Sequence, residues 1–244
     1  MKIITNRYHS HFVDDLDIVE LGSVIFDTDE NKIYIMLEPG VLTEITDKNV
    51  RVETLEALTQ AIMAGGKIEL AASVDAPTGF VITIDTTIVN NGEITIKEDT
   101  KGDGVFTVTN GTLTLNGKGT INGLGKNDWS MAVWAKENGK VIINDGYFTN
   151  VGAKSAEDSE HFDLIYASGN AQIEINGGEF KCETPKWTLN IKDKDRATAS
   201  IVVKGGKFHG FNPANCDVEG LNTNFVASGY KVVEKDGVFI VMPE

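Results

Sequence analysis

The sequence predicts an all-β protein: a right-handed, single-stranded parallel β-helix between a β-rich N-terminal region and a C-terminal hairpin. The main observation is a sequence motif that occurs three times. In each copy an alternating apolar strand is followed by a polar residue, a glycine turn and an aromatic residue. Its copies are residues 141–148 (VIINDGYF), 173–180 (IEINGGEF) and 201–208 (IVVKGGKF). The phenylalanines lie 32 and 28 residues apart. A period in this range is typical of coils that bury their apolar faces against one another.

Related short strands recur from residue 92 onward, and they begin at or after a glycine or alanine. They predict one interior column of stacked residues, formed by Ile94, Leu113, Val141, Ile173 and Ile201. Second strands at 131–134, 164–167 and 187–191 indicate two strands and a glycine turn per coil. We expect Phe148, Phe180 and Phe208 to stack inside the coils, and Asn116, Asn144 and Asn176 to form an asparagine ladder at the turns.

The two ends of the chain depart from the repeat. Residues 1–48 predict a β-rich region with a hairpin from Ser23–Asp27 and Lys32–Leu37, but their apolar content is too small for a core of their own. Residues 49–66 predict a capping helix with Thr54 as N-cap, apolar residues at helical spacing (Leu55, Leu58, Ile62 and Met63) and a stop at Gly65-Gly66. The β-helix then covers 67–229, and residues 230–244 form a hairpin cap with Asp-Gly in its turn.

Composition restricts the function more than the fold. The chain of 244 residues carries a formal net charge of −14. This charge disfavours binding to nucleic acid and to anionic membrane surfaces, because their phosphates would be repelled. The N-terminus lacks the apolar segment of a secretion signal, and no apolar run is long enough to span a bilayer. The expectation is a protein made in a cytoplasm without membrane insertion.

Residue types that often carry chemistry are present without a recognisable catalytic motif. Cys182 and Cys216 form no C-x-x-C pair, and two buried thiols are favoured over a disulfide, which the sequence leaves open. His9 and His11 would share one face of a strand, which suits an exposed or interface pair better than a metal site. The remaining aromatic candidates for sugar binding are better explained by core packing; they are Trp129, Trp134 and Trp187.

Two carboxylate clusters lie in loops between strands, at residues 157–163 and 192–196. Acid–base cleavage of a glycan needs two carboxylates at a fixed separation, and either cluster contains suitable residue types. Solvated loops are the simpler interpretation, and a bound calcium ion stays open as an alternative. The sequence therefore predicts a protein that is not an enzyme, with no catalytic, cofactor-binding or metal-binding residues.

Two segments carry a family resemblance. Residues 205–215 (GGKFHGFNPAN) with 224–232 (NFVASGYKV) resemble fibre-like proteins of phages that infect gut bacteria. Residues 22–27 (GSVIFD) and 32–35 (KIYI) resemble the capsid-anchoring starts of phage head-fibre and decoration proteins.

The resemblance implies a pectate-lyase-like β-helix and a virion structural protein, either a head fibre or a capsid decoration. It further implies a homotrimer attached to the capsid through its N-terminal region, with adhesion to host glycans as a possible role. The alternative is a tail or baseplate adhesin that binds or cleaves bacterial surface polysaccharide.

Overall fold

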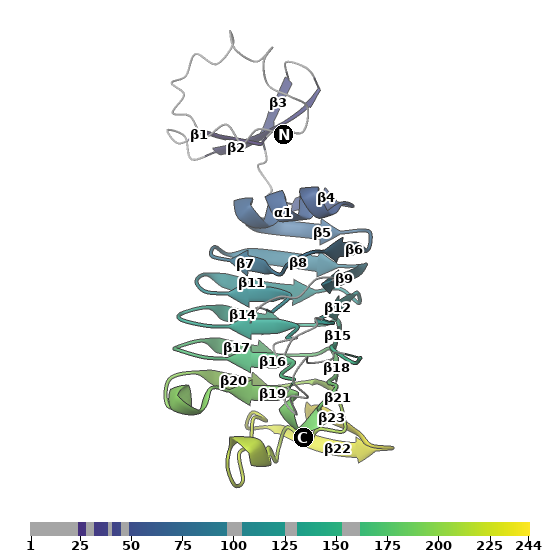
Figure 1. Ribbon diagram of the computed structural model, residues 1–244, viewed down its shortest axis with the longest axis vertical. Helices are drawn as coiled ribbons and strands as arrows, with labels where there is room; N and C mark the ends of the chain where they lie inside the picture. The colour runs from purple at the N-terminus through teal and green to yellow at the C-terminus, as the bar shows by residue number, and fades with distance from the viewer. Residues whose placement is uncertain are drawn as a thin grey trace. The chain divides into compact units, whose positions relative to one another are not determined.

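The computed structural model describes residues 24–27, 32–38, 41–44, 49–96, 104–124, 131–152 and 162–244. The chain divides into two compact units, residues 1–49 and 50–244. In the first unit, β1 (Val24–Asp27), β2 (Lys32–Glu38) and β3 (Val41–Glu44) form an antiparallel sheet in that order (Figure 1). The predicted pairing of the first two strands is confirmed, whereas β3 was not expected. His9 and His11 lie outside the described residues.

The second unit begins with β4 (Asn49–Val52) and α1 (Leu55–Ala64). The side-chain oxygen of Thr54 accepts a hydrogen bond from the backbone N–H of Ala57 at 3.2 Å, and the helix ends at Gly65, whose φ of +69° suits glycine. The N-cap at Thr54 and the stop at Gly65 are as predicted, but residues 49–52 of the region assigned to the capping helix form the strand β4. Met63, however, is 62% exposed, because the buried face of the helix is formed by Leu58, Ala61 and Ile62.

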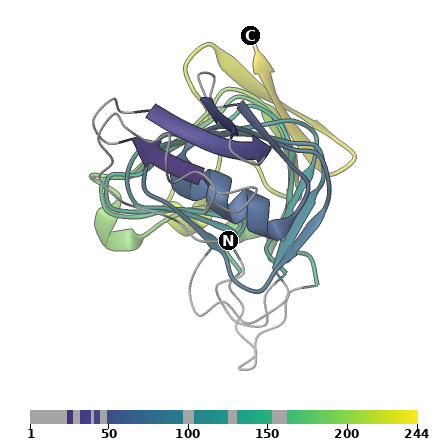
Figure 2. The same cartoon turned by 90° about the horizontal axis from the view of Figure 1, so that it is seen from above.

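Three parallel sheets follow, and the chain visits them in strict rotation, so that every third strand belongs to the same sheet. We call one such round a coil, and the whole series the coil stack (Figures 1 and 2). Sheet 1 contains β4 and then β5 (Gly66–Leu70), β8 (Thr86–Asn90), β11 (Thr112–Asn116), β14 (Lys140–Ile143), β17 (Gln172–Ile175) and β20 (Ser200–Val203).

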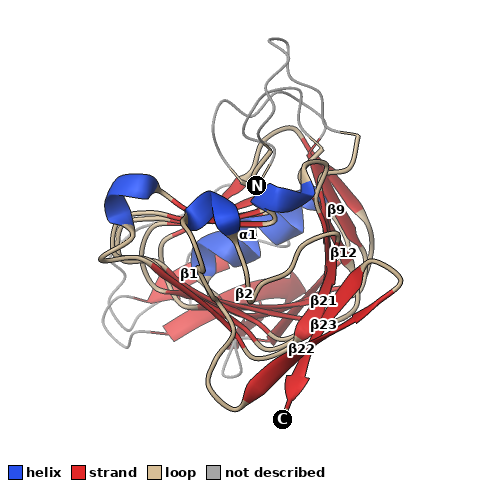
Figure 3. Cartoon of the chain, turned by 90° about the horizontal axis from the view of Figure 1, so that it is seen from below, coloured by secondary structure: helices blue, strands red, loops and turns tan. Residues whose placement is uncertain are grey.

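The other two sheets complete each coil (Figure 3). Sheet 2 contains β6 (Val74–Ala76), β9 (Glu93–Ile96), β12 (Thr120–Asn122), β15 (Tyr147–Thr149), β18 (Glu179–Lys181) and β21 (Gly206–His209). Sheet 3 contains β7 (Phe80–Ile82), β10 (Phe106–Val108), β13 (Val133–Ala135), β16 (Ile165–Ala167) and β19 (Leu189–Ile191). A coil therefore has three strands rather than the two predicted. The additional strand belongs to sheet 2 and is formed by the residues around the aromatic position of each repeated motif.

The predicted interior column is correct in four of its five members. Leu113, Val141, Ile173 and Ile201 are register partners in sheet 1, and all four are buried. Ile94 does not belong to this column, since it lies in sheet 2 opposite Ile121. The partner of Leu113 in the preceding coil is Thr86. This buried threonine donates its hydroxyl to the carbonyl of Ile84 at 3.0 Å, which lets a polar residue occupy an interior position.

The phenylalanine stack in sheet 2 is confirmed. Phe148 and Phe180 have ring centroids 5.0 Å apart with an 11° interplanar angle, and Phe180 and Phe208 follow at 4.8 Å and 8°. All three side chains are fully buried. One phenylalanine per coil thus forms a continuous aromatic column within the apolar interior.

The asparagine ladder on the outside of sheet 1 is also confirmed. Asn144 Nδ2 donates to Asn116 Oδ1, and Asn176 Nδ2 donates to Asn144 Oδ1, both at 2.9 Å. Because each amide has both a donor and an acceptor, a stack of identical residues satisfies itself from coil to coil. The ladder is structural, as the sequence indicated.

The C-terminal hairpin consists of β22 (Tyr230–Lys235) and β23 (Val238–Pro243), with Asp236 and Gly237 at positive φ in the turn. β23 pairs antiparallel with β21 and extends sheet 2, which places Phe239 opposite Phe208. The segment before the hairpin, residues 210–229, contributes buried side chains to the core beyond the last complete coil; these are Phe211, Cys216 and Phe225.

Both cysteines are free and buried, in agreement with the favoured prediction. Cys182 donates its thiol to the carbonyl of Phe162 at 2.8 Å. Burial raises the pKa of Cys182 to about 12 and that of Cys216 to about 11. At neutral pH both side chains are therefore protonated and unreactive.

Candidate functional site

The outer face of sheet 3 carries the chemistry-bearing residues that the coil stack brings closest together. Its central outward positions are register partners in successive coils: Thr107, Trp134, Tyr166 and Asn190. In β10, β16 and β19 all three residues are buried, so this sheet is buried on both faces over much of its length. Polar groups there must find partners within the protein.

Two aromatic residues lie side by side in this column. The ring centroids of Trp134 and Tyr166 are 6.0 Å apart, and Lys136 Nζ lies 4.6 Å from the centroid of the Trp134 ring. Trp134 Nε1 donates to Ser168 Oγ at 3.0 Å. Trp134 and Trp187 are both partly exposed, and the prediction that the tryptophans are core residues is wrong for Trp134. Trp134 alternates with the inward-facing Val133 and Ala135 and so faces outward. Trp129 lies outside the described residues.

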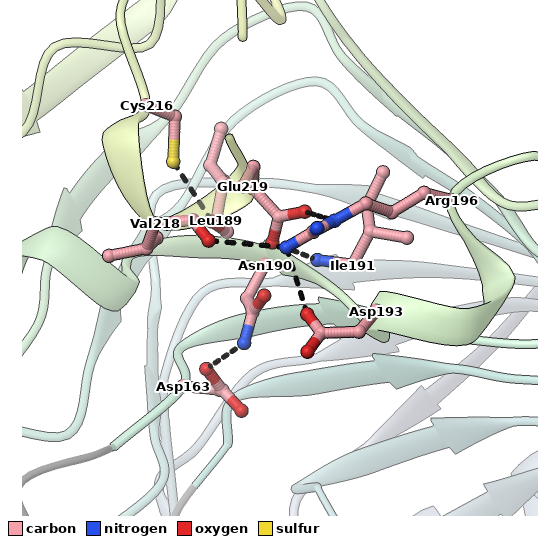
Figure 4. A network of polar contacts seen from close by, with 9 residues as sticks. All are labelled: Asp163, Leu189, Asn190, Ile191, Asp193, Arg196, Cys216, Val218 and Glu219. Atoms are coloured by element: carbon pink, nitrogen blue, oxygen red, sulfur yellow. Dashed lines mark hydrogen bonds and ion pairs between the residues drawn. The ribbon is translucent and has the colours of Figure 1, made fainter. Parts of the chain in front are cut away.

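Asp163 is a titratable group that contacts this column at Asn190 (Figure 4). Its Oδ1 accepts a hydrogen bond from Asn190 Nδ2 at 2.7 Å. Burial raises the pKa of Asp163 from 3.8 to about 6; the hydrogen bond from Asn190 opposes this shift, and the charge of Glu219 adds to it. A carboxyl group whose pKa lies near neutrality is one signature of a functional site.

Glu219 lies beside it as a buried carboxylate, with its side chain only 2% exposed. Its Oε1 accepts from the backbone N–H of Ile191 at 2.6 Å, and its Oε2 accepts from Arg196 Nε at 2.9 Å. Ile191 belongs to β19, the last strand of sheet 3. Glu219 therefore satisfies an N–H on a strand edge that has no following coil in this sheet.

Arg196 completes the network shown in Figure 4. Its Nη2 donates to Asp193 Oδ1 at 2.8 Å and to the carbonyl of Val218 at 3.1 Å. The guanidinium thus connects the segment of residues 193–196 to the segment that contains Glu219. Sequence reasoning missed Glu219, because a single glutamate in a loop carries no signal until the strand edge it serves is known.

The two predicted carboxylate clusters have different outcomes. Of the first, residues 157–161 lie outside the described residues, and Asp163 enters the network above. In the second, Asp195 Oδ2 accepts from the backbone N–H of Gly169 at 2.8 Å, and Asp193 binds Arg196. The second cluster thus makes local structural contacts. In the described part of the chain, no group of three or more His, Cys, Asp or Glu residues is arranged to hold a metal ion.

The chemical capacity of the site rests on Asp163 alone. A carboxyl with a pKa near 6 can accept or donate a proton at neutral pH. Cleavage of a glycosidic bond needs a second, available carboxylate. Glu219 does not meet this need, since its two oxygens already bind Ile191 and Arg196.

The raised pKa of Asp163 leads to a prediction about how the stability of the protein depends on pH. Because the folded state binds this proton more tightly than the unfolded chain, stability should rise as pH falls from about 7 to about 4. We expect Asp163→Asn to stabilise the protein at pH 7 by about 1–2 kcal/mol, a figure discounted for partial exposure of the carboxyl. The variant should also flatten the pH dependence. Urea unfolding at pH 4.5 and pH 7, with the exposed Glu234→Gln as control, checks this; a destabilised Asp163→Asn would contradict it.

Comparison of the chain with known protein families, with curated proteins and with solved structures gives no match. Among the described residues, no helix has the length and apolar character needed to cross a membrane.

Proposed function

We propose that the protein is a non-enzymatic structural component of a bacteriophage virion, a head fibre or capsid decoration. It attaches through the N-terminal region and displays the coil stack. The observation that carries the proposal is the division of the chain into a small unit with an antiparallel sheet and a large unit of parallel coils. This division is consistent with the anchor and display parts implied by the resemblance of residues 22–27 and 32–35 and of residues 205–215 and 224–232.

The proposal includes the finer features of the fold. We assign the coil stack to the right-handed parallel β-helices, because parallel strands connected across a sheet follow right-handed paths in nearly all proteins. At its start, α1 acts as a cap, since its buried residues pack on the first coil. At its end, residues 210–229 act as a cap together with the hairpin. Val226 forms a parallel bridge with Val203, and this gives the last strand of sheet 1 a partner.

The assembly part of the proposal is a homotrimer held by the N-terminal region. The apolar content of residues 1–48 is too small for a core of their own. In a closed symmetric oligomer, the strands of each copy could pack against those of its neighbours. Deletion of residues 1–47 should therefore abolish both trimer formation and attachment to virions. It should leave the β-rich circular dichroism spectrum of the coil stack intact. A truncated protein that still forms trimers in light scattering and still attaches to particles would contradict this assignment.

One observation favours a second function, a tail or baseplate adhesin that cleaves surface polysaccharide. It is the position of Asp163, with its raised pKa, close to the aromatic ring of Tyr166 on the outside of the coils. Incubation with bacterial capsular polysaccharides and measurement of new reducing ends and unsaturated products would distinguish the two functions. Cleavage that disappears in Asp163→Ala or Asp195→Ala would establish the second function and contradict the first.

A further inference from the structure

We propose that a groove along the corner between sheets 1 and 2 binds an uncharged, hydroxyl-rich saccharide chain. The groove has a volume of about 410 Å³ and crosses four successive coils, from Lys118 to Lys207. Neighbouring parallel strands lie about 4.8 Å apart, so three steps between coils give a length of about 14 Å. This suits a linear ligand that runs across the strands, from coil to coil.

The hollow itself follows from how the coils stack. A Cβ atom at Gly177 would lie 2.3 Å from the carbonyl oxygen of Asn144, and the other lining glycines have a positive φ that side chains rarely adopt: Gly146, Gly178 and Gly206. No side chain fits at these positions, and the corner is consequently bare backbone. The glycines alone indicate no ligand. The inference depends on the side chains that line the groove.

Three of these side chains come from successive coils of sheet 2. Tyr147, Glu179 and Lys207 are register partners on its outward face. Tyr147 and Glu179 are partly exposed, and Lys207 is exposed. Lys118 and Asp145 line the groove from the corner itself. One aromatic ring, two ammonium groups and two carboxylates thus surround a floor of glycine backbone.

The charges of the lining cancel, although the whole chain carries −14. A polyanion would be repelled by the net charge of the whole protein, and a lining whose own charges cancel gives a polycation no net local attraction. Hydroxyl groups both donate and accept hydrogen bonds, so they suit a lining that contains ammonium donors and carboxylate acceptors. An aromatic ring adds an apolar surface for the C–H face of a sugar.

An extended peptide fits the groove less well. Peptides that add to a sheet need a free strand edge. Here the backbone N–H groups of Tyr147, Glu179 and Lys207 already donate to the carbonyls of Gly119, Gly146 and Gly178. The groove therefore offers side chains rather than a backbone edge.

Two contacts define the end of the groove near the C-terminus. His209 Nε2 lies 2.7 Å from Glu179 Oε1 and holds that carboxylate in place. Ile240 and Val241 of β23 form the wall on this side. The pairing of β23 with β21 thus closes the groove as well as extending the sheet.

The inference deepens the display function proposed above and rests on it for its biological setting. The test uses the full chain on an array of immobilised polysaccharides, with mannan, galactan and a neutral glucan as uncharged probes and alginate as the anionic probe. We expect binding to at least one neutral probe and none to alginate. Tyr147→Ala should weaken that binding by about tenfold or more. Tyr147→Phe should retain most of it, because the ring is kept.

Lys207→Ala should also weaken binding, whereas Lys231→Ala, an exposed lysine of β22 that does not line the groove, should leave it unchanged. Absence of binding to every neutral probe, a preference for alginate, or equal binding by Tyr147→Ala and the unmodified chain would overturn the inference. None of these results bears on attachment to virions, which the deletion of residues 1–47 tests separately.

Discussion

Replacement of Ile173 by aspartate should lower the free energy of unfolding by about 4 kcal/mol or more, enough to unfold much of the protein at room temperature. Ile173 is 2% exposed and lies in register between Val141 and Ile201. The substitution removes a buried aliphatic side chain and leaves an unpaired charge between two coils. Nothing in the interior column offers a hydrogen bond to compensate.

The matched control is Gln172→Asp, one position earlier in β17, where the side chain is exposed. It should change the free energy of unfolding by no more than about 0.5 kcal/mol. Denaturant unfolding followed by circular dichroism measures both variants. If the two variants had equal stability, Ile173 could not face the interior, and the register of sheet 1 would be wrong.

Gly205→Ala should also be strongly destabilising, by about 3 kcal/mol. The added Cβ would lie 2.2 Å from the carbonyl oxygen of Asn176 in the preceding coil, and the main chain fixes the positions of both atoms. No side-chain rotation can relieve the contact, so the two coils must separate at this corner.

Gly237→Ala separates this steric effect from the cost of backbone conformation. Gly237 has a φ of +75°, and no heavy atom lies within 4 Å of a Cβ placed there. The Gly237→Ala variant should therefore lose only roughly 1 kcal/mol of its free energy of unfolding, which is the cost expected of alanine in a left-handed conformation. Thermal unfolding of both variants would decide the matter, and a Gly205→Ala protein as stable as Gly237→Ala would contradict the close stacking of coils.

The features that could be predicted from the sequence are those set by local periodicity. Phe148, Phe180 and Phe208 repeat with their strands, and Thr54 precedes an apolar helix pattern; both assignments are confirmed. The third strand of each coil, in sheet 2, was missed, because strands of three residues such as Tyr147–Thr149 are too short to show alternation. The strand β8 was missed for another reason. It begins with Thr86, whose polar side chain occupies an interior position and so interrupts the apolar pattern.

The candidate site was less predictable, because it depends on contacts between distant segments. Asp163 was one of several loop carboxylates in the sequence, and only the fold places it beside Asn190, 27 residues away. Glu219 and Ile191 lie 28 residues apart and meet because sheet 3 ends at β19. The groove at the glycine corner likewise needs the register of four coils. Its residues Tyr147, Glu179 and Lys207 have no shared chemical type that would single them out in the sequence.

The proposal that the protein belongs to a virion is tested most directly on purified phage particles. The measurement is immunogold labelling in electron microscopy, with an antibody raised against residues 50–244, on particles purified through a density gradient. We predict label on intact particles, at the head surface, since the coil stack is displayed outward. Label confined to the tail would support the adhesin alternative instead. Particles that carry no label, while the soluble fraction of the lysate contains the protein, would contradict a structural role in the virion.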